Sequence, residues 1–174
     1  MRATFMCRGT PEVFRKSRPP ESRQLSAPIH SMEGNRHWRR PLTIGEQICG
    51  MKRLFSFLEP IVHRNSVTWT GPIRPHKSAL TYEIEIRYTL GSTPRTWVTS
   101  PTLVANGHGE IPHLYADGSL CLHLPSEWNP RQLIAATVVP WVSDWLVHYE
   151  IWRATENWEG GGVHPRRSQV KPKL

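Results

Sequence analysis

The residues from 80 to 90 constrain the fold most strongly, because apolar and polar side chains alternate there without a break. The even-numbered positions are apolar and the odd-numbered ones are polar or charged: Leu80, Tyr82, Ile84, Ile86, Tyr88 and Leu90 against Thr81, Glu83, Glu85, Arg87 and Thr89. Side chains two residues apart share one face of a strand. The pattern therefore predicts a half-buried strand of an antiparallel sheet.

Shorter strands are expected on either side of this one. Residues 67–69 are rich in strand-forming side chains and precede Gly71-Pro72, which we interpret as the start of a turn. A further strand is predicted at residues 96–98 or at residues 101–105, after the turn residues Gly91-Ser92. Together these segments predict an antiparallel meander.

A helix is predicted before the strands. Thr43 has the position of an N-cap, and Glu46 follows it at the capping-box spacing. Apolar residues then recur at helical intervals, and Pro60 is expected to end the helix.

A second helical region is predicted over residues 128–158. It is expected to start at Asn129-Pro130, to be interrupted by Pro140 and to stop at Gly160-Gly161-Gly162. One face carries aromatic residues, which indicates packing in the core or at an interface: Trp141, Trp145, Tyr149 and Trp152. A helix, a meander, a long loop and further helices predict an α+β fold.

Positive charge is concentrated at the two ends of the chain. Of the 22 Lys and Arg residues, nine lie in residues 1–40 and four in the last nine, whereas residues 41–165 hold nine against eleven acidic residues. We therefore expect a disordered basic extension over residues 1–41, one folded domain over residues 42–160 and a basic tail over residues 161–174. A nucleic-acid groove needs basic residues on one face of the fold, so nucleic-acid binding through the ends is only an alternative.

The cysteine content and the hydropathy restrict the class of protein to which the chain can belong. Cys7, Cys49 and Cys121 are few and odd in number, which argues against a secreted disulfide framework. They have no metal-ligand spacing, and no segment approaches the roughly 18 apolar residues of a membrane span. We expect a cytoplasmic protein with free thiols and without a metal, a cofactor or a membrane segment.

Cys121 is the candidate for chemistry. It lies between Leu120 and Leu122, after the turn-forming pair Asp117-Gly118. A cysteine between leucines is most often buried and inert, so these residues alone leave a reactive and a structural role open.

The surroundings of Cys121 resemble the active-site signature of ubiquitin-conjugating (UBC) enzymes. That signature reads His-Pro-Asn, a short loop, Gly-x-Ile-Cys-Leu and then Trp-x-Pro; the matching residues are Pro112, Gly118, Leu120-Cys121-Leu122, Trp128 and Pro130. Residues 69–72, with Gly71-Pro72, are similar to the Gly-Pro turn between the first two strands of that family. The resemblance covers roughly residues 43–158. It implies a UBC-like fold in which Cys121 forms a thioester and Trp128 packs the cysteine loop against the core.

The C-terminal block is more closely similar to the bacterial UBC-like proteins of type II short CBASS anti-phage operons. The residues concerned are Pro140-Trp141, Asp144-Trp145-Leu146, Tyr149-Glu150, Trp152, Trp158, Gly160-Gly161-Gly162 and His164-Pro165. The resemblance implies that Cys121 carries the C-terminus of the operon's cGAS-like nucleotidyltransferase (CD-NTase) and transfers it to a target amine, which primes cyclic-nucleotide signalling. The chain has no Gly-rich nucleotide motif, as expected for the stand-alone form without an adenylating domain.

One residue departs from the family signature. His113 occupies the place of the asparagine that, in the family, stabilises the oxyanion. An imidazole N–H can donate to an oxyanion, or it can bond a backbone carbonyl and hold the loop, and both interpretations stay open. His123 would face the same side as Cys121 only in an extended segment. We interpret His108, His148 and His164 as surface or structural residues, and Asp117 as a turn residue.

Two other functions remain alternatives. A cysteine hydrolase would use Cys121 with His113 or His123 and would also pass through an acyl-enzyme. A binding module of the same fold would retain Cys121 without using it. Exposed aromatic side chains of the C-terminal block could also form a homodimer surface.

Overall fold

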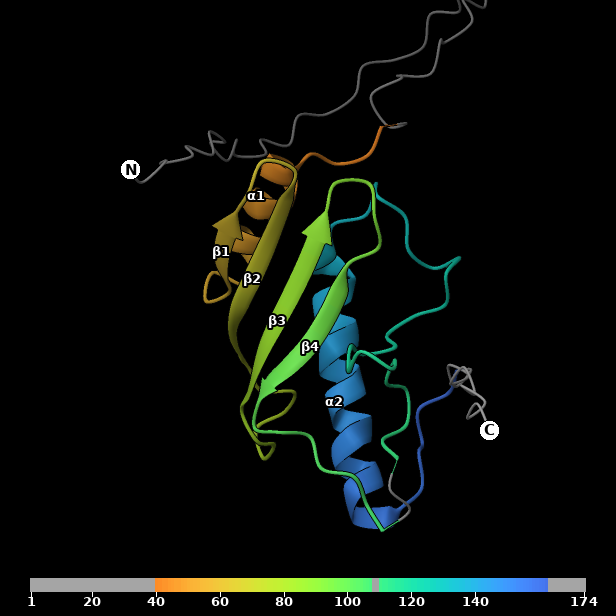
Figure 1. Cartoon of the computed structure of the whole chain (residues 1–174). Coiled ribbons are helices and arrows are strands. Elements are labelled where there is room, and N and C mark those ends of the chain that lie inside the picture. Colours follow the sequence, from red (N-terminus) through yellow and green to blue (C-terminus); the bar gives the residue numbers. More distant parts are fainter. Residues whose placement is uncertain (1–39, 108–109, 163–174) are drawn as a thin grey trace, which may run out of the picture. The chain divides into compact units, whose positions relative to one another are not determined.

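The structure is a computed structural model that describes residues 40–107 and 110–162. Helix α1 (Ile44–Leu54) precedes the strands β1 (Glu59–Val62), β2 (Ser66–Ile73), β3 (Tyr82–Thr89) and β4 (Arg95–Ser100). A 3-10 turn, η2 (Ile134–Ala136), leads into helix α2 (Val138–Thr155). The strands form an antiparallel sheet in the order β1-β2-β3-β4, which confirms the predicted α+β fold with a meander (Figure 1). The extension and tail predicted at the two ends lie outside the described residues, apart from residues 40–41 and 161–162.

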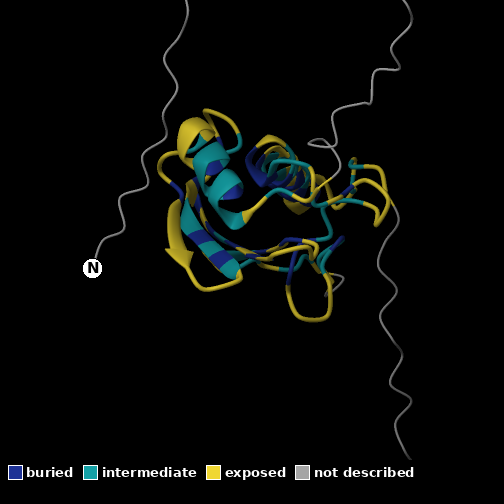
Figure 2. Cartoon of the chain, turned by 90° about the horizontal axis from the view of Figure 1, so that it is seen from above, coloured by how far each residue is buried: buried dark blue, intermediate teal, exposed yellow. Residues whose placement is uncertain are grey.

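Strand β3 forms the centre of the core, as its alternation predicts. Tyr82, Ile84, Ile86 and Tyr88 are all buried, and both helices cover this face of the sheet (Figure 2). The prediction was wrong at the two ends of the pattern, because Leu80 and Leu90 lie outside the strand and are 60% and 46% exposed. The backbone leaves the sheet at both points; the amide of Leu80 donates instead to Glu150 Oε1 on α2.

The aromatic stripe of α2 packs in the core. Trp145, Tyr149 and Trp152 are buried, and the rings of Trp145 and Tyr149 stack with their centroids 5.4 Å apart. Trp141 lies partly exposed at the edge of the core. The core interpretation of the stripe is therefore confirmed for its three buried members.

Helix α1 begins as predicted but ends earlier. The amide of Glu46 donates to Thr43 Oγ1 and the amide of Thr43 donates to Glu46 Oε2, which completes the capping box. A hydrogen bond from Arg40, followed by that backbone bond, lowers the pKa of Glu46 to about 2. The helix ends at Leu54 rather than at Pro60, which lies in β1. Since β1 is an edge strand, it tolerates a proline that has no N–H to donate.

Gly71-Pro72 lies within β2, so the predicted turn at this point was wrong. Gly71 pairs with Ile84 and Pro72 with Glu83. A Cβ atom at Gly71 would come within 2.6 Å of the carbonyl oxygen of Phe57. The glycine is therefore needed because the connection after α1 passes directly over the strand.

The C-terminal helical region is shorter than predicted. Asn129 opens a turn, in which the amide of Arg131 donates to Asn129 Oδ1, and α2 starts only at Val138. Pro140 is the third residue of α2, in the first turn, where backbone N–H groups have no intrahelical partner; it therefore does not interrupt the helix. Glu156, with a left-handed φ of 62°, ends the helix before the glycine run.

Gln47 ties α1 to the segment before α2. Its side chain is fully buried; Nε2 donates to the carbonyl oxygen of Gln132, and Oε1 accepts from the amide of Ile134 at 2.9 Å. The apolar positions of α1 gave no indication of this polar contact.

Replacing Gln47 should destabilise the domain more than its hydrophobicity would indicate. Gln47→Leu leaves one backbone carbonyl and one amide without partners, each costing roughly 1–3 kcal/mol. We expect the free energy of unfolding in urea to fall by about 2–4 kcal/mol. The exposed variant Lys52→Ala on the same helix should change it by less than about 0.5 kcal/mol. Equal stability of Gln47→Leu and the wild type would contradict this account.

Candidate active site

Cys121 lies at the end of a short antiparallel hairpin in the loop after β4. Leu114 pairs with Leu120, the amide of Tyr115 donates to the carbonyl of Ser119, and the amide of Cys121 donates to the carbonyl of His113 at 2.8 Å. The pairing therefore places Cys121 directly opposite His113. A bond from the amide of Leu120 to the carbonyl of Thr96 fixes the hairpin to β4.

The tip of this hairpin is held by Asp117. Its Oδ1 accepts from the amide and the hydroxyl of Ser119, and its Oδ2 accepts from Arg95 at 2.8 Å. The bond from the Ser119 hydroxyl is the main reason that the pKa of Asp117 is lowered. Gly118, with a φ of 78°, supplies the left-handed residue that the turn needs. The interpretation of Asp117 as a turn residue is confirmed.

Tyr115 is linked to Cys121. A hydrogen bond with Cys121, followed by burial, raises the pKa of Tyr115. The guanidinium of Arg95 lies over the tyrosine ring, 5.1 Å from its centroid. The sequence analysis missed this residue; the turn at Asp117-Gly118 was its only signal, because pairing across the turn brings Tyr115 back towards the cysteine.

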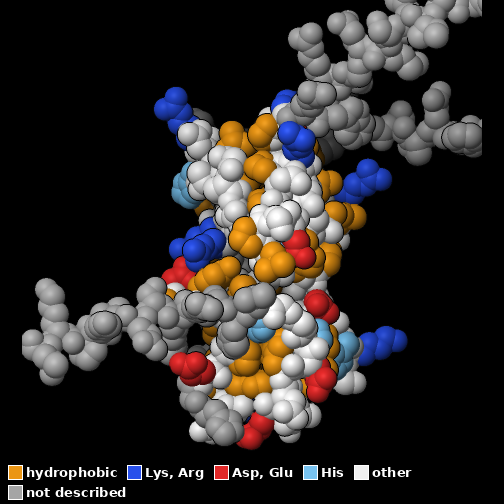
Figure 3. Space-filling model, turned by 90° about the vertical axis from the view of Figure 1, so that its right-hand side faces the viewer, with side chains coloured by type: hydrophobic (Ala, Val, Ile, Leu, Met, Phe, Trp, Pro, Cys, Tyr) orange, Lys and Arg blue, Asp and Glu red, His pale blue; other side chains and the backbone are white. Residues whose placement is uncertain are grey.

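Cys121 is partly exposed and lines a cavity of about 100 Å³ between the hairpin and α2. We call this the cysteine cavity; its lining residues are His113, Cys121, Leu122, Trp141, Asp144, Trp145, His148, Trp158, Gly160 and Gly161. Figure 3 shows this side of the molecule, where histidine side chains lie among apolar ones in the lower half. A partly exposed thiol beside imidazoles is the kind of setting in which cysteines react.

The glycine run predicted to stop the helix instead forms a wall of the cysteine cavity. A Cβ at Gly160 would come within 2.9 Å of the His148 ring and 2.7 Å of Trp158 Nε1, and one at Gly162 would meet His113 Cε1 at 3.3 Å. The glycines therefore let the chain lie directly on both imidazole rings.

The comparison with protein families agrees with this arrangement. A family model described as type II CBASS E2 protein matches residues 47–165. The chain belongs to this family. The match spans both the hairpin with Cys121 and the segment from Trp158 to Gly162, and it gives the protein an E2-like role in CBASS antiviral defence. A comparison with curated proteins finds no match to the chain.

His113, the second predicted site residue of this CBASS E2 protein, lies beside Cys121. Its backbone has a left-handed φ of 53°, a conformation in which histidine and asparagine are enriched among residues with a Cβ. Its carbonyl accepts from Cys121 and from Trp145 Nε1, and its buried ring stacks on Trp158 at 5.0 Å. The backbone of His113 thus holds the loop, and its ring lines the cysteine cavity.

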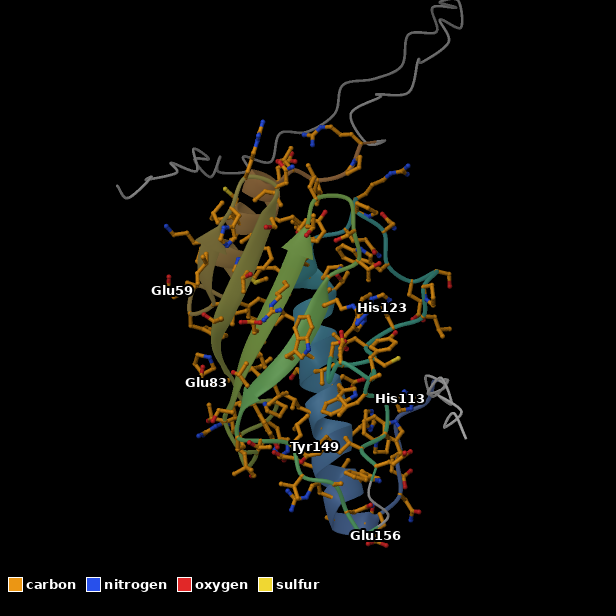
Figure 4. All side chains as sticks on the ribbon, in the orientation of Figure 1. Glu59, Glu83, His113, His123, Tyr149 and Glu156 are labelled. Atoms are coloured by element: carbon orange, nitrogen blue, oxygen red, sulfur yellow. The ribbon has the colours of Figure 1, made fainter. Side chains whose placement is uncertain are left out.

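His123 is not brought to the cysteine. Its ring packs on Trp141 at 5.0 Å and lines a separate hollow of about 230 Å³, with Tyr115 and Arg95. Leu122 borders both the hollow and the cysteine cavity. His113 and His123 accordingly lie at different heights along α2 (Figure 4).

The sequence analysis missed the role of α2 in forming the site. Asp144 and His148 line the cysteine cavity, although His148 was interpreted as a surface or structural residue. Their i,i+4 spacing places them on one face of the helix, with Trp141 and Trp145. The sequence contains this spacing, but it does not show that this face of the helix meets the cysteine.

Three further observations complete the site. Trp128 packs into the core with its ring edge against Tyr88, as expected. Across residues 40–107 and 110–162, no three His, Cys, Asp or Glu side chains gather in a position to hold a metal ion. Over the same residues, neither helix is long and apolar enough to cross a membrane.

Removing the Tyr115 hydroxyl should slow the reactions of Cys121. Tyr115→Phe deletes the donor to the sulfur, and a hydrogen bond to a charged group contributes roughly 1.5–3 kcal/mol when it is well shielded from water. Because Tyr115 is 39% exposed, we expect alkylation of Cys121 by iodoacetamide at pH 7 to slow by about three- to tenfold. Peptide mass spectrometry can follow Cys49 in the same molecules as the control. Unchanged labelling of Cys121 would contradict the role of the hydroxyl.

Proposed function

We propose that this CBASS E2 protein is a thioester-forming transferase with Cys121 as the nucleophile. The observation that carries the proposal is the setting of the thiol: Cys121 is partly exposed, opposite His113 in the hairpin and in contact with Tyr115. The order of helix, four-stranded meander, cysteine loop and helix supports a UBC-like fold for the domain over residues 42–160.

The acyl donor in this proposal is the C-terminus of the cGAS-like nucleotidyltransferase from the same operon. It arrives as an activated acyl group, an adenylate or a thioester. The Cys121 sulfur bonds to the carbonyl carbon, and AMP or a thiol leaves with its electron pair. A target amine then attacks the same carbon, the carbon–sulfur bond breaks, and an amide and free Cys121 result. A thiolate suits both steps, because it is a strong nucleophile and a good leaving group.

Both steps pass through a tetrahedral oxyanion that needs a positioned donor. The ring of His113 lines the cysteine cavity, and a hydrogen bond links the phenol of Tyr115 to Cys121. Either side chain can supply a hydrogen bond to the oxygen, and His113 occupies the place where the family resemblance predicts that donor.

Co-expression with the neighbouring nucleotidyltransferase tests the thioester. Intact-mass spectrometry should find the wild type carrying the nucleotidyltransferase, and a thiol reductant should remove the adduct. Cys121→Ser should give an ester that survives the reductant, and Cys121→Ala should give no adduct. Cys49→Ser serves as the matched control and should behave as the wild type.

A second candidate is a cysteine hydrolase acting on such conjugates. This candidate is favoured because the imidazoles of His113 and His148 both line the cysteine cavity. Either imidazole could deprotonate a water molecule that attacks the acyl-enzyme. A hydrolase should cleave a purified conjugate in the absence of any amine and lose this activity in His113→Ala or His148→Ala. An unmodified wild type, with a Cys121→Ala variant that still binds the nucleotidyltransferase, would instead indicate a binding module.

A further inference from the structure

Two ionisable side chains of α2, Asp144 and His148, line the cysteine cavity together with the proposed nucleophile Cys121. Asp144 and His148 lie one turn apart on α2, with His148 Nε2 3.7 Å from Asp144 Oδ1. The Asp144 side chain is 74% exposed and that of His148 is 25% exposed, so the pair lies where the cavity opens to solvent. The titratable groups lining the cavity are Cys121, His113, Asp144 and His148.

The imidazole of His148 is held in place on two sides. The ring of Trp158 packs against it with centroids 5.8 Å apart, and Gly160 lies too close to the ring to accept a Cβ. Its Nδ1 is buried without a hydrogen-bond partner within the described part of the chain. Packing therefore fixes the ring, and Nε2, the nitrogen beside Asp144, is the one left to exchange a proton.

We propose that His148 is the base that removes the proton from the attacking amine. This step rests on the proposed function, in which an amine attacks the thioester on Cys121. A lysine amine is protonated at neutral pH, so it must lose a proton to attack, and an imidazole titrates close enough to neutral pH to accept it.

The proposed step balances. The amine nitrogen bonds to the thioester carbonyl carbon and its proton passes to His148 Nε2. The carbon–sulfur bond breaks with its electron pair on Cys121 Sγ, and the proton can return to that sulfur or to solvent. Asp144 Oδ1 lies 3.7 Å from His148 Nε2, so its carboxylate stabilises the imidazolium that forms when Nε2 takes up the proton.

The other two histidines near the cysteine are placed less well for this step. The ring of His113 is buried and lies nearly parallel to Trp158, at an interplanar angle of 27°. His123 lines the other hollow, which Cys121 does not border.

Comparing free lysine with hydroxylamine as the attacking nucleophile distinguishes a base role of His148 from a purely structural role. Cys121 is loaded by exchange with a synthetic peptide thioester that ends in glycine, and discharge is followed by intact mass from pH 6 to 9. Free lysine needs a base, whereas hydroxylamine is largely unprotonated already. General-base catalysis typically contributes 10²–10⁴-fold, so we expect His148→Gln to slow discharge to lysine by about 100-fold. Discharge to hydroxylamine should change by less than about twofold, because its nitrogen is unprotonated before attack and the proton it loses afterwards can pass to solvent.

The chain offers a matched control pair. His76 Nε2 lies 3.3 Å from Glu150 Oε2, and neither residue lines the cysteine cavity or the hollow with His123. His76→Gln should therefore discharge at the wild-type rate. His148→Ala should recover discharge to lysine when imidazole is added, and Asp144→Asn should show a smaller loss that is also restricted to lysine.

The possible results distinguish the two proposals. Wild-type discharge to lysine in His148→Gln, or an equal loss with both nucleophiles, overturns the role of His148 and leaves the thioester intact. Failure of wild-type Cys121 to load overturns the proposed function and this step with it. If His148→Gln does not fold, Asp144→Asn decides, because its exposed side chain can be changed without disturbing the core; a wild-type rate with lysine then overturns the proposal.

Discussion

The carbonyl oxygen of His113 connects the two strands of the cysteine hairpin with helix α2. The oxygen of His113 accepts both from the amide of Cys121, across the hairpin, and from the indole of Trp145, on α2. Because Trp145 is itself fixed in the core beside Tyr149, the position of the cysteine is set by the packing of the helix against the sheet. The left-handed backbone of His113 turns this oxygen to where both donors reach it. The loop thus carries the nucleophile, but the core determines where it lies.

The sequence was sufficient for the parts of the fold that a periodic pattern describes. Strand β3 and the capped start of α1 follow from local alternation and capping chemistry; the start of α1 is where the pattern places it, and β3 is shorter than the pattern at both ends. Cys121 was recognisable only from its spacing to Trp128 and from the order of elements, because a cysteine between leucines has no distinctive chemistry of its own. Glycine and proline were the least reliable guides. Gly71 and Gly160 are required by contacts with distant segments that no local signal contains, and Pro140 is tolerated because α2 starts only two residues before it.

The site beyond Cys121 could not be predicted, because it is formed by contacts between distant segments. His148 and Asp144 share a helix face by their spacing, but the hairpin that this face meets lies more than twenty residues earlier in the chain. The wall of the cysteine cavity comes from yet another segment, after the end of α2. Gln47 shows the same difficulty inside the core, where a polar side chain on an apolar helix face satisfies backbone groups about 85 residues away.

The hairpin also limits how an oxyanion can be stabilised here. In serine proteases, the backbone N–H of the nucleophile itself forms part of the oxyanion hole. In this protein the amide of Cys121 is already bonded to the carbonyl of His113, and breaking that bond would release the hairpin from its partner. Any oxyanion formed on Cys121 therefore depends on other donors, and the phenol of Tyr115 and the ring of His113 are two side chains in its surroundings that can supply one. A histidine at position 113 combines a left-handed backbone with a side-chain donor, which an aliphatic residue would not.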